Sequence, residues 1–168
     1  MRLNEKKSGF SLVELVVVIV IIGILAAIAI PRLSRGSTGA SQSALSANLA
    51  TVRGAIALYA IEHNNKFPGA DAAGFKDKLT KYTDISGDAQ AAKDNTHIYG
   101  PYLAAIPPCP VGQNAGKTTA ADILIDSTNS PPTPVPASGQ GWVYNPTTGE
   151  FFPNTDQTDD SGKAFTGY

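Results

Sequence analysis

The amino-acid sequence predicts an α+β protein in which one long N-terminal helix packs on a small antiparallel β-sheet. Three patterns lead to this prediction. Residues 10–30 form an almost uninterrupted apolar run. Residues 40–63 repeat apolar side chains at helical spacing. Residues 141–153 contain two short runs rich in aromatic side chains, separated by a Pro-Thr-Thr-Gly turn.

The apolar run from Phe10 to Ile30 is long enough to cross a membrane. A helix rises about 1.5 Å per residue, so roughly 20 residues span the ~30 Å hydrocarbon core of a bilayer. Lipid offers no hydrogen-bond partners to a free backbone, so the run must be helical there. Only Ser11, Glu14 and Gly23 interrupt it. Because a carboxylate in hydrocarbon costs roughly 3 kcal/mol or more unless it is paired, Glu14 is a candidate functional residue.

Two other interpretations of this run stay open. Lys6 and Lys7 precede it, and Ala27-Ile28-Ala29 resembles the small-residue cleavage site of a secretory signal. The apolar core of such signals is only about 7–15 residues long, however, and has no use for a buried carboxylate. The second alternative is an ordinary single-pass anchor.

The order of the N-terminal parts carries a family resemblance. A polar leader ends in Lys7-Ser8-Gly9, the apolar helix follows directly as Phe10-Ser11-Leu12-Val13-Glu14-Leu15, and Pro31 lies downstream. This arrangement resembles the prepilin signature of type IV pilins and type II secretion pseudopilins. The resemblance implies a type IV pilin-like fold and a membrane peptidase that cuts between Gly9 and Phe10 and methylates Phe10. It also implies that Glu14 pairs with the Phe10 amine of a neighbouring subunit during assembly.

The charges near Glu14 fit such a pairing. Between Phe10 and Arg32 the chain has no Lys or Arg, so the nearby cation would be an α-amine created by cleavage. In a bundle of identical helices, a stagger of one subunit satisfies the carboxylate and the amine together. Breaking a buried pair typically costs about 3–5 kcal/mol, so a subunit in the wrong register would be disfavoured.

Composition bounds the rest of the chain. Its 168 residues suggest one modest domain. The leader holds three of the 13 basic and one of the 14 acidic residues, so cleavage leaves 10 and 13 and a net charge of about −3. The absence of a polybasic patch argues against a dedicated nucleic-acid partner. The single cysteine, Cys109, cannot form an internal disulfide, whereas many type IV pilins close a C-terminal loop with one.

The second half of the helix is expected to have one apolar face. Residues 34–39 contain two glycines and are expected to be a weak helix, and Asn64-Asn65 is expected to end the helix. Alternating spacings of four and three residues define an apolar stripe that must cover a sheet. The stripe comprises Leu45, Leu49, Val52, Ile56 and Tyr59, and the opposite positions carry Gln42, Asn48, Arg53 and Glu62.

Beyond the helix, short elements alternate with loops. Residues 75–79 are sufficient for a short helix, and residues 121–126 for a short strand. Residues 141–145 and 150–153 are expected to pair as a hairpin at the edge of the sheet. Residues 127–141 are rich in proline and small polar side chains, which predicts a mobile surface loop.

The C-terminal tail is acidic. Asp156, Asp159 and Asp160 are oxygen ligands close together in sequence, and the resemblance to secretion major pseudopilins implies that they bind calcium. The glycine and distal glutamate of an EF-hand loop are missing, so a solvated acidic tail without metal is the favoured alternative. No other cofactor is indicated.

These observations favour a structural protein over an enzyme, since no catalytic constellation stands out. The resemblance implies a cleaved leader (residues 1–9), a transmembrane and filament-core helix (10–31) and a periplasmic or extracellular globular part (32–168). It implies a bacterial inner-membrane protein, extracted into a helical filament of copies of itself by an assembly platform. A type II secretion pseudopilin is favoured by the missing disulfide and by Pro101-Tyr102-Leu103 before a proline-rich turn. A surface type IV pilin and a single-pass anchored binding module are the alternatives.

Overall fold

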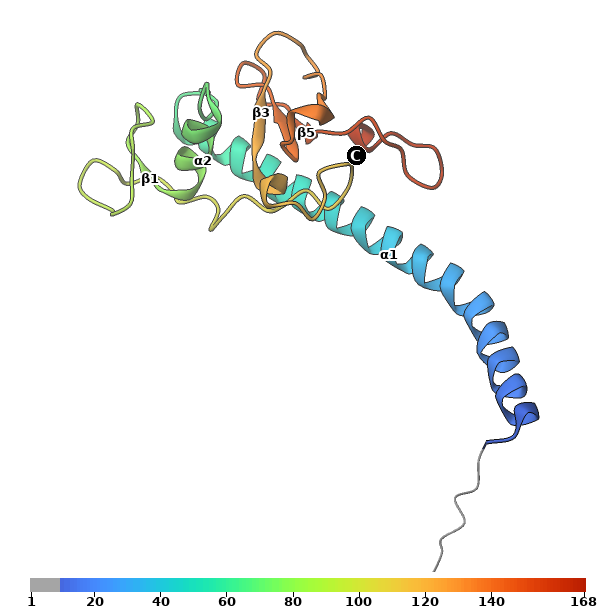
Figure 1. The fold of residues 1–168 in the computed structure, drawn as a ribbon. Helices are drawn as coiled ribbons and strands as arrows, with labels where there is room; N and C mark the ends of the chain where they lie inside the picture. The colour runs from blue at the N-terminus through green and yellow to red at the C-terminus, as the bar shows by residue number, and fades with distance from the viewer. Residues whose placement is uncertain (1–9) are drawn as a thin grey trace, which may run out of the picture. The chain divides into compact units, whose positions relative to one another are not determined.

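The computed structural model of the chain describes residues 10–168, apart from the side chains at positions 29–37, 118 and 120 (Figure 1). The chain divides into two units, one that ends at Gly39 and one that comprises Ala40–Tyr168. We refer to residues 10–39 as the stem and to residues 40–168 as the head. Helix α1 (Leu12–Glu62) contributes residues to both.

Helix α1 is continuous, which confirms the long N-terminal helix. Residues 34–39, expected to be a weak helix, are helical throughout. The helix ends as predicted before Asn64 and Asn65, whose φ angles of 55° and 60° are left-handed. Asparagine tolerates this conformation better than most residues do. The amide of Asn65 donates to the carbonyl of Ala60 at 2.8 Å, which satisfies one of the carbonyl groups left unpaired at the helix end.

The predicted apolar stripe forms the core of the head. Its five side chains are at most 2% exposed, and they belong to one buried cluster with Trp142, Tyr144 and Phe151 of the sheet. Burying each large apolar side chain contributes roughly 1.5–3 kcal/mol. The expected packing of the helix on a sheet is therefore confirmed, and these contacts are the main source of the head's stability.

The polar side chains opposite the apolar stripe of α1 also make contacts within the head. Asn48 donates from Nδ2 to the carbonyl of Pro108 at 3.2 Å, and Glu62 accepts from the hydroxyl of Tyr102 at 2.5 Å. Arg53 reaches the main chain of the C-terminal segment. Three of the four polar side chains opposite the stripe thus hold other segments against the helix.

A short helix, α2 (Ala72–Thr80), follows α1 and extends the predicted segment 75–79 at its N-terminal end. Asp71 caps it by accepting a hydrogen bond from the amide of Gly74 at 2.8 Å. Phe75 and Leu79, one turn apart, are fully buried in the core. The sequence pattern therefore located the helix correctly and missed only the capping turn.

A small lobe follows α2 in the chain and precedes the main sheet. Its strands β1 (Tyr82–Thr83) and β2 (Ala89–Gln90) pair antiparallel, and Thr83 also bridges Tyr99. Ile85 in the intervening turn is half exposed, so it is not a core residue.

The main sheet has three strands, β3 (Ile123–Ile125), β4 (Trp142–Tyr144) and β5 (Phe151–Pro153), in the order β3-β4-β5. Strands β4 and β5 form the predicted antiparallel hairpin. Strands β3 and β4 run parallel, so the expectation of a purely antiparallel sheet is wrong. Parallel neighbours need a long crossover connection, and the proline-rich residues 126–141 supply it.

The turn between β4 and β5 depends on a glycine. Asn145 holds the turn by accepting at Oδ1 from the amide of Thr147 at 2.7 Å. Gly149 has a left-handed φ of 76°, and a Cβ atom there would lie 2.4 Å from the ring of Phe67. A side chain at position 149 would therefore be strained and would collide with the core.

The crossover loop, expected to be mobile, is fastened to the sheet by buried Asn154. Its Oδ1 accepts from the amide of Val135 at 2.6 Å, and its Nδ2 donates to the carbonyl of Val135 and to Ser138 and Gln140. The loop therefore has a defined path despite its composition. Three 3-10 turns complete the head: η1 (Thr118–Ala121), η2 (Pro136–Ser138) and η3 (Phe165–Gly167).

Candidate functional site

The start of α1 is built around Ser11 and Glu14. The first helical residue is Leu12, so Ser11 occupies the N-cap position. Glu14 Oε2 accepts a hydrogen bond from the amide of Ser11 at 2.8 Å, and Ser11 Oγ accepts from the amide of Val13 at 3.3 Å. These reciprocal bonds form a capping box, which satisfies amides that otherwise have no partner at a helix start. Glu14 is thus already bonded within its own chain.

The stem exposes its apolar side chains. Large apolar residues from Leu12 to Ile28 are 44–77% exposed, and Phe10 is 81% exposed. A contiguous apolar surface of this length is uncommon on a soluble monomer and marks a membrane or protein contact. Apart from the backbone of its own helix, Gly23 has no described atom within 4 Å of the position that a Cβ would occupy, so this part of the helix surface is open as well.

Within the described residues, two helical segments are candidates for comparison with a membrane span. Thr38–Glu62 passes by length and composition, but 39% of its apolar window is buried in the head, so it is a core helix. Leu12–Ile28 is a shorter apolar segment whose side chains are exposed. Its exposure and its position at the start of α1 make the stem the candidate for the membrane.

The acidic tail is not gathered into a ligand set. Asp159 accepts at Oδ1 from the Ser161 hydroxyl at 2.6 Å and at Oδ2 from the Tyr168 hydroxyl at 2.6 Å. These bonds hold the pKa of Asp159 well below its usual range. Asp156 accepts from Gln113 Nε2 at 2.7 Å, and Asp160 is exposed. Within the described part of the chain no three His, Cys, Asp or Glu side chains are placed to share a metal, so calcium binding stays a prediction from sequence.

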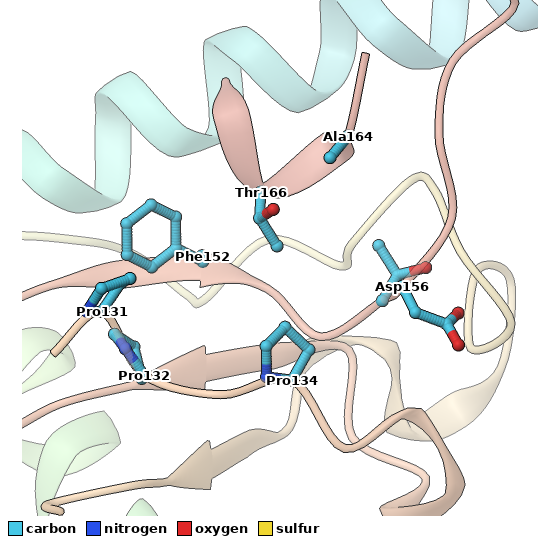
Figure 2. A pocket seen from close by; sticks show the side chains of 8 residues that line it. Pro131, Pro132, Pro134, Phe152, Asp156, Ala164 and Thr166 are labelled. Atoms are coloured by element: carbon cyan, nitrogen blue, oxygen red, sulfur yellow. The ribbon is translucent and has the colours of Figure 1, made fainter. Parts of the chain in front are cut away.

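A cavity of about 350 Å³ opens between the crossover loop, β5 and the C-terminal segment (Figure 2). Figure 2 shows prolines of the loop and Phe152 on one side and Ala164 and Thr166 on the other. Among the described residues that line it, Asp156 is the only titratable one, and it lies at the edge. With a mostly apolar lining and a single carboxylate at its edge, this cavity is suited to binding an apolar group and not to acid–base catalysis. Its lining consists of Pro131, Pro132, Pro134, Phe152, Thr155, Asp156, Ala164 and Thr166.

Two reactive side chains in the head are structural. His63 is buried, stacks on Tyr59 with ring centroids 3.8 Å apart, and places Nε2 3.0 Å from the Thr83 hydroxyl. Its Nδ1 faces the carbonyl of Tyr59 at 2.8 Å, so Nδ1 donates and Nε2 accepts. Burial raises the pKa of the Cys109 thiol to about 11, which makes it a poor nucleophile at neutral pH. Both side chains serve packing rather than chemistry.

Comparison with known proteins identifies the N-terminal segment. Residues 5–30 match the family described as the prokaryotic N-terminal methylation motif. The chain carries a prepilin-type signal. This signal supports a type IV pilin-like or pseudopilin protein, a class of structural subunits rather than enzymes. No curated protein and no solved structure matches the chain significantly.

The prepilin-type signal spans the start of α1. The three site residues predicted from sequence have different positions there. Gly9 lies outside the described residues. Phe10 is exposed just before the helix, and Glu14 lies in its first turn. Sequence reasoning missed Ser11, although the spacing Ser-x-x-Glu before an apolar run is a recognised helix-start signal.

Proposed function

We propose that the chain is a structural subunit of a type II secretion pseudopilus. A prepilin peptidase removes residues 1–9 by cutting between Gly9 and Phe10, and Phe10 is N-methylated. Residues 10–31 then form the membrane and filament-core helix, and residues 32–168 the globular periplasmic part. The prepilin-type signal, which leads directly into a helix with exposed apolar side chains, supports a filament subunit of either kind. The choice of a pseudopilin over a pilin rests on the single cysteine and on Pro101-Tyr102-Leu103 before a proline-rich turn.

The stem supports both states that such a subunit occupies. Before assembly, its apolar side chains from Leu12 to Ile28 are covered by lipid of the inner membrane, with the leader on the cytoplasmic side. In the filament, stems of neighbouring copies cover one another. Both environments remove the same apolar area from water, so transfer from membrane to filament requires no refolding of the stem.

Glu14 gives the filament its register in this proposal. Its carboxylate pairs with the methylated Phe10 amine of a neighbouring subunit, since the stem from Phe10 to Ile28 has no Lys or Arg. A register that leaves the carboxylate unpaired in an apolar core is costly. The partners are therefore copies of the chain, related pseudopilins, the prepilin peptidase and an inner-membrane assembly platform.

A surface type IV pilin is the second candidate. The specific observation in its favour is Cys109-Pro110-Val111-Gly112, which stands after the proline-rich turn where secretion major pseudopilins often have Asp-Pro-Trp-Gly. The exposed proline-rich crossover loop would then belong to the outer surface of an adhesive, motility or DNA-uptake filament. A single-pass anchored binding module, the third reading, requires that cleavage after Gly9 does not occur.

Deletion of the chain separates the two filament functions. A strain without it is assayed in parallel for release of secreted proteins and for twitching or surface attachment, with the plasmid-borne wild-type chain as the control. Loss of secretion alone supports the pseudopilin. Loss of twitching or attachment with normal secretion would overturn the pseudopilin assignment in favour of the surface pilin.

A further inference from the structure

Thr133 lies in the proline-rich part of the crossover loop and has an exposed side chain. The segment reads Ser130-Pro131-Pro132-Thr133-Pro134-Val135-Pro136. A proline fixes its own φ at about −65° and restricts the residue before it, so the backbone on both sides of Thr133 is stiff. Proline mixed with serine and threonine is also typical of segments that carry O-linked sugars.

The hydroxyl of Thr133 is free, whereas most hydroxyls of the loop are bonded. Those of Thr128, Ser130 and Ser138 donate to a carboxylate or to a main-chain carbonyl. Within the described part of the chain, no hydrogen bond reaches Thr133 Oγ1, but the Thr133 amide donates to Asp126 Oδ2 at 2.8 Å. The backbone at Thr133 is therefore held in place while its hydroxyl is accessible to an enzyme.

The side chain of Thr133 borders a surface hollow of about 330 Å³. Pro132 and Pro134 line the cavity of Figure 2, whereas Thr133 between them lines this second hollow, next to β3. Its aliphatic side chains give the hollow an apolar floor, on which the C–H face of a sugar ring can bury apolar surface. The hollow thus leaves space for a ring attached to Thr133. Its lining consists of Leu124, Ile125, Asp126, Asn129, Thr133 and Val135.

The surroundings of Thr133 favour a neutral, O-linked group. Asp126 lines the same hollow, and hydrogen bonds from the Thr133 amide and from Thr128 and Asn129 hold the pKa of Asp126 well below its usual range. A phosphate on Thr133 would add a charge of about −1.5 to −2 beside this ionised carboxylate, whereas a sugar adds none. The one Asn-x-Thr match in the sequence, at residues 145–147, has proline at the position that excludes an N-linked sugar.

We propose that Thr133 Oγ1 is the attachment site of an O-linked sugar. In the transfer, Oγ1 attacks the anomeric carbon of a glycosyl diphosphate donor, and the bond between that carbon and the diphosphate oxygen breaks. The hydroxyl proton passes to a base of the transferase, and the diphosphate leaves with the electron pair. This modification goes beyond the proposed filament function and does not depend on the choice between pseudopilin and pilin.

The test uses the full-length chain purified from the cells that naturally produce it. Its intact mass is measured, and the peptide that contains residues 127–141 is fragmented under conditions that keep side-chain groups attached. The wild-type mass is expected to exceed that of the unmodified chain by one or more whole sugar residues, all located on Thr133. Thr133→Ala is expected to lose the whole excess, and Thr133→Ser, which keeps a hydroxyl, to retain most of it.

Ser127→Ala is the matched control. Ser127 belongs to the same loop, is exposed and has no hydrogen bond from its hydroxyl among the described residues, but it does not line the hollow. This variant is expected to keep the full mass excess. Thr133→Ala leaves the amide at position 133 bonded to Asp126, so it should unfold at the same denaturant concentration as Ser127→Ala, as followed by Trp142 fluorescence.

Three results would overturn the proposal. The first is a wild-type chain without any added mass in the peptide 127–141, and the second is a phosphate there in place of a sugar. The third is a mass excess that Ser127→Ala loses and Thr133→Ala keeps. The N-terminal peptide of the same samples shows whether the leader is removed, so a failure of the proposed processing is read separately from a failure of the proposed modification.

Discussion

Arg53 on α1 donates from Nη1 to the main-chain oxygen of Tyr168 at 2.9 Å, across 115 positions of sequence. Its Nε donates to the carbonyl of Phe151 in β5 at 3.0 Å, and its guanidinium lies 5.0 Å from the ring centre of Phe152. Burial lowers the pKa of Arg53, which stays protonated at physiological pH. One side chain of the helix thus holds both the last strand and the C-terminal segment, a role that a disulfide plays in many pilins.

Replacing Arg53 by Ala is expected to lower the free energy of unfolding of the head by about 2–3 kcal/mol, because two charge-assisted hydrogen bonds and their ring contact are lost. Arg53→Lys is expected to recover only part of this loss, since an ammonium cannot form the same fork of bonds. Denaturation is followed by the fluorescence of Trp142, the single tryptophan, which is buried beside Phe151.

Lys66→Ala removes an exposed cation near the end of the same helix and serves as the control, with an expected change within about 0.5 kcal/mol. If Arg53→Ala unfolds at the same denaturant concentration as the Lys66 variant, the C-terminal segment does not depend on Arg53.

Asn154 is expected to be the main anchor of the crossover loop. Asn154→Ala leaves the amide and the carbonyl of Val135 without their side-chain partner in a nearly buried site, at a cost of about 2–3 kcal/mol. Protease cleavage within residues 127–141 should become faster in this variant. Asn154→Asp keeps the acceptor and loses the donors, so an intermediate rate is expected. Unchanged cleavage in both variants would mean that the loop is held by other contacts.

The lobe that follows α2 contains a cluster of titratable side chains. His97 lies 3.0 Å from Asp94 through Nδ1 and 3.3 Å from Asp88 through Nε2. The hydrogen bond to Asp94, aided by that to Asp88, raises the pKa of His97. The amide of His97 in turn donates to Asp94, and this bond, with that from the Thr96 amide, holds the pKa of Asp94 well below its usual range.

The sign of the pH dependence follows from these two shifts. The contribution of His97 is complete below its unfolded pKa of about 6.5 and is lost as pH rises through its raised folded value. The contribution of Asp94 is present above its unfolded pKa of about 3.9 and is lost as pH falls through its lowered folded value. The free-energy difference between wild type and His97→Gln should therefore shrink from pH 6 to pH 9.

Proton NMR titration of His97 checks the same point directly. Its pKa should lie above 6.5 in wild type and fall in Asp94→Asn. A His97 pKa unaffected by Asp94→Asn would contradict the cluster.

Sequence periodicity predicted the parts of the fold that depend on local patterns. The stripe from Leu45 to Tyr59, the helix at 75–79 and the hairpin of β4 and β5 all follow from spacing and turn residues. The parallel pairing of β3 with β4 does not, because it depends on where a loop of 16 residues returns to the sheet, and no local signal encodes that path.

The polar residues of α1 show the same division. The sequence places Arg53 and Glu62 opposite the apolar stripe, but it does not show that their partners are Tyr168 and Tyr102 of distant segments. At the candidate site, the sequence alone identified Glu14, because a carboxylate is rare in an apolar helix. The Ser-x-x-Glu spacing also predicts the capping role of Ser11, which the hydrogen bond between the Ser11 amide and Glu14 shows in α1.

Glu14 tests the register of the proposed filament. Glu14→Gln keeps a neutral acceptor in the capping box, so membrane insertion and the amount of full-length chain should match wild type. The same substitution removes the negative charge and should lower filament yield at least tenfold, since an unpaired ammonium in an apolar core costs about 3–5 kcal/mol. Glu14→Ala should be at least as defective. Wild-type filament yield from Glu14→Gln would rule out pairing of Glu14 with the Phe10 amine.

The N-terminal sequence and intact mass of the chain recovered from cells test the central claim most directly. The account predicts a chain that begins at Phe10 and carries one additional methyl group on its amine. A chain that begins near Ile30 would mean a secreted domain released by signal cleavage, and an intact Met1 would mean an ordinary membrane anchor. Either of these results would contradict prepilin processing and the filament built on it.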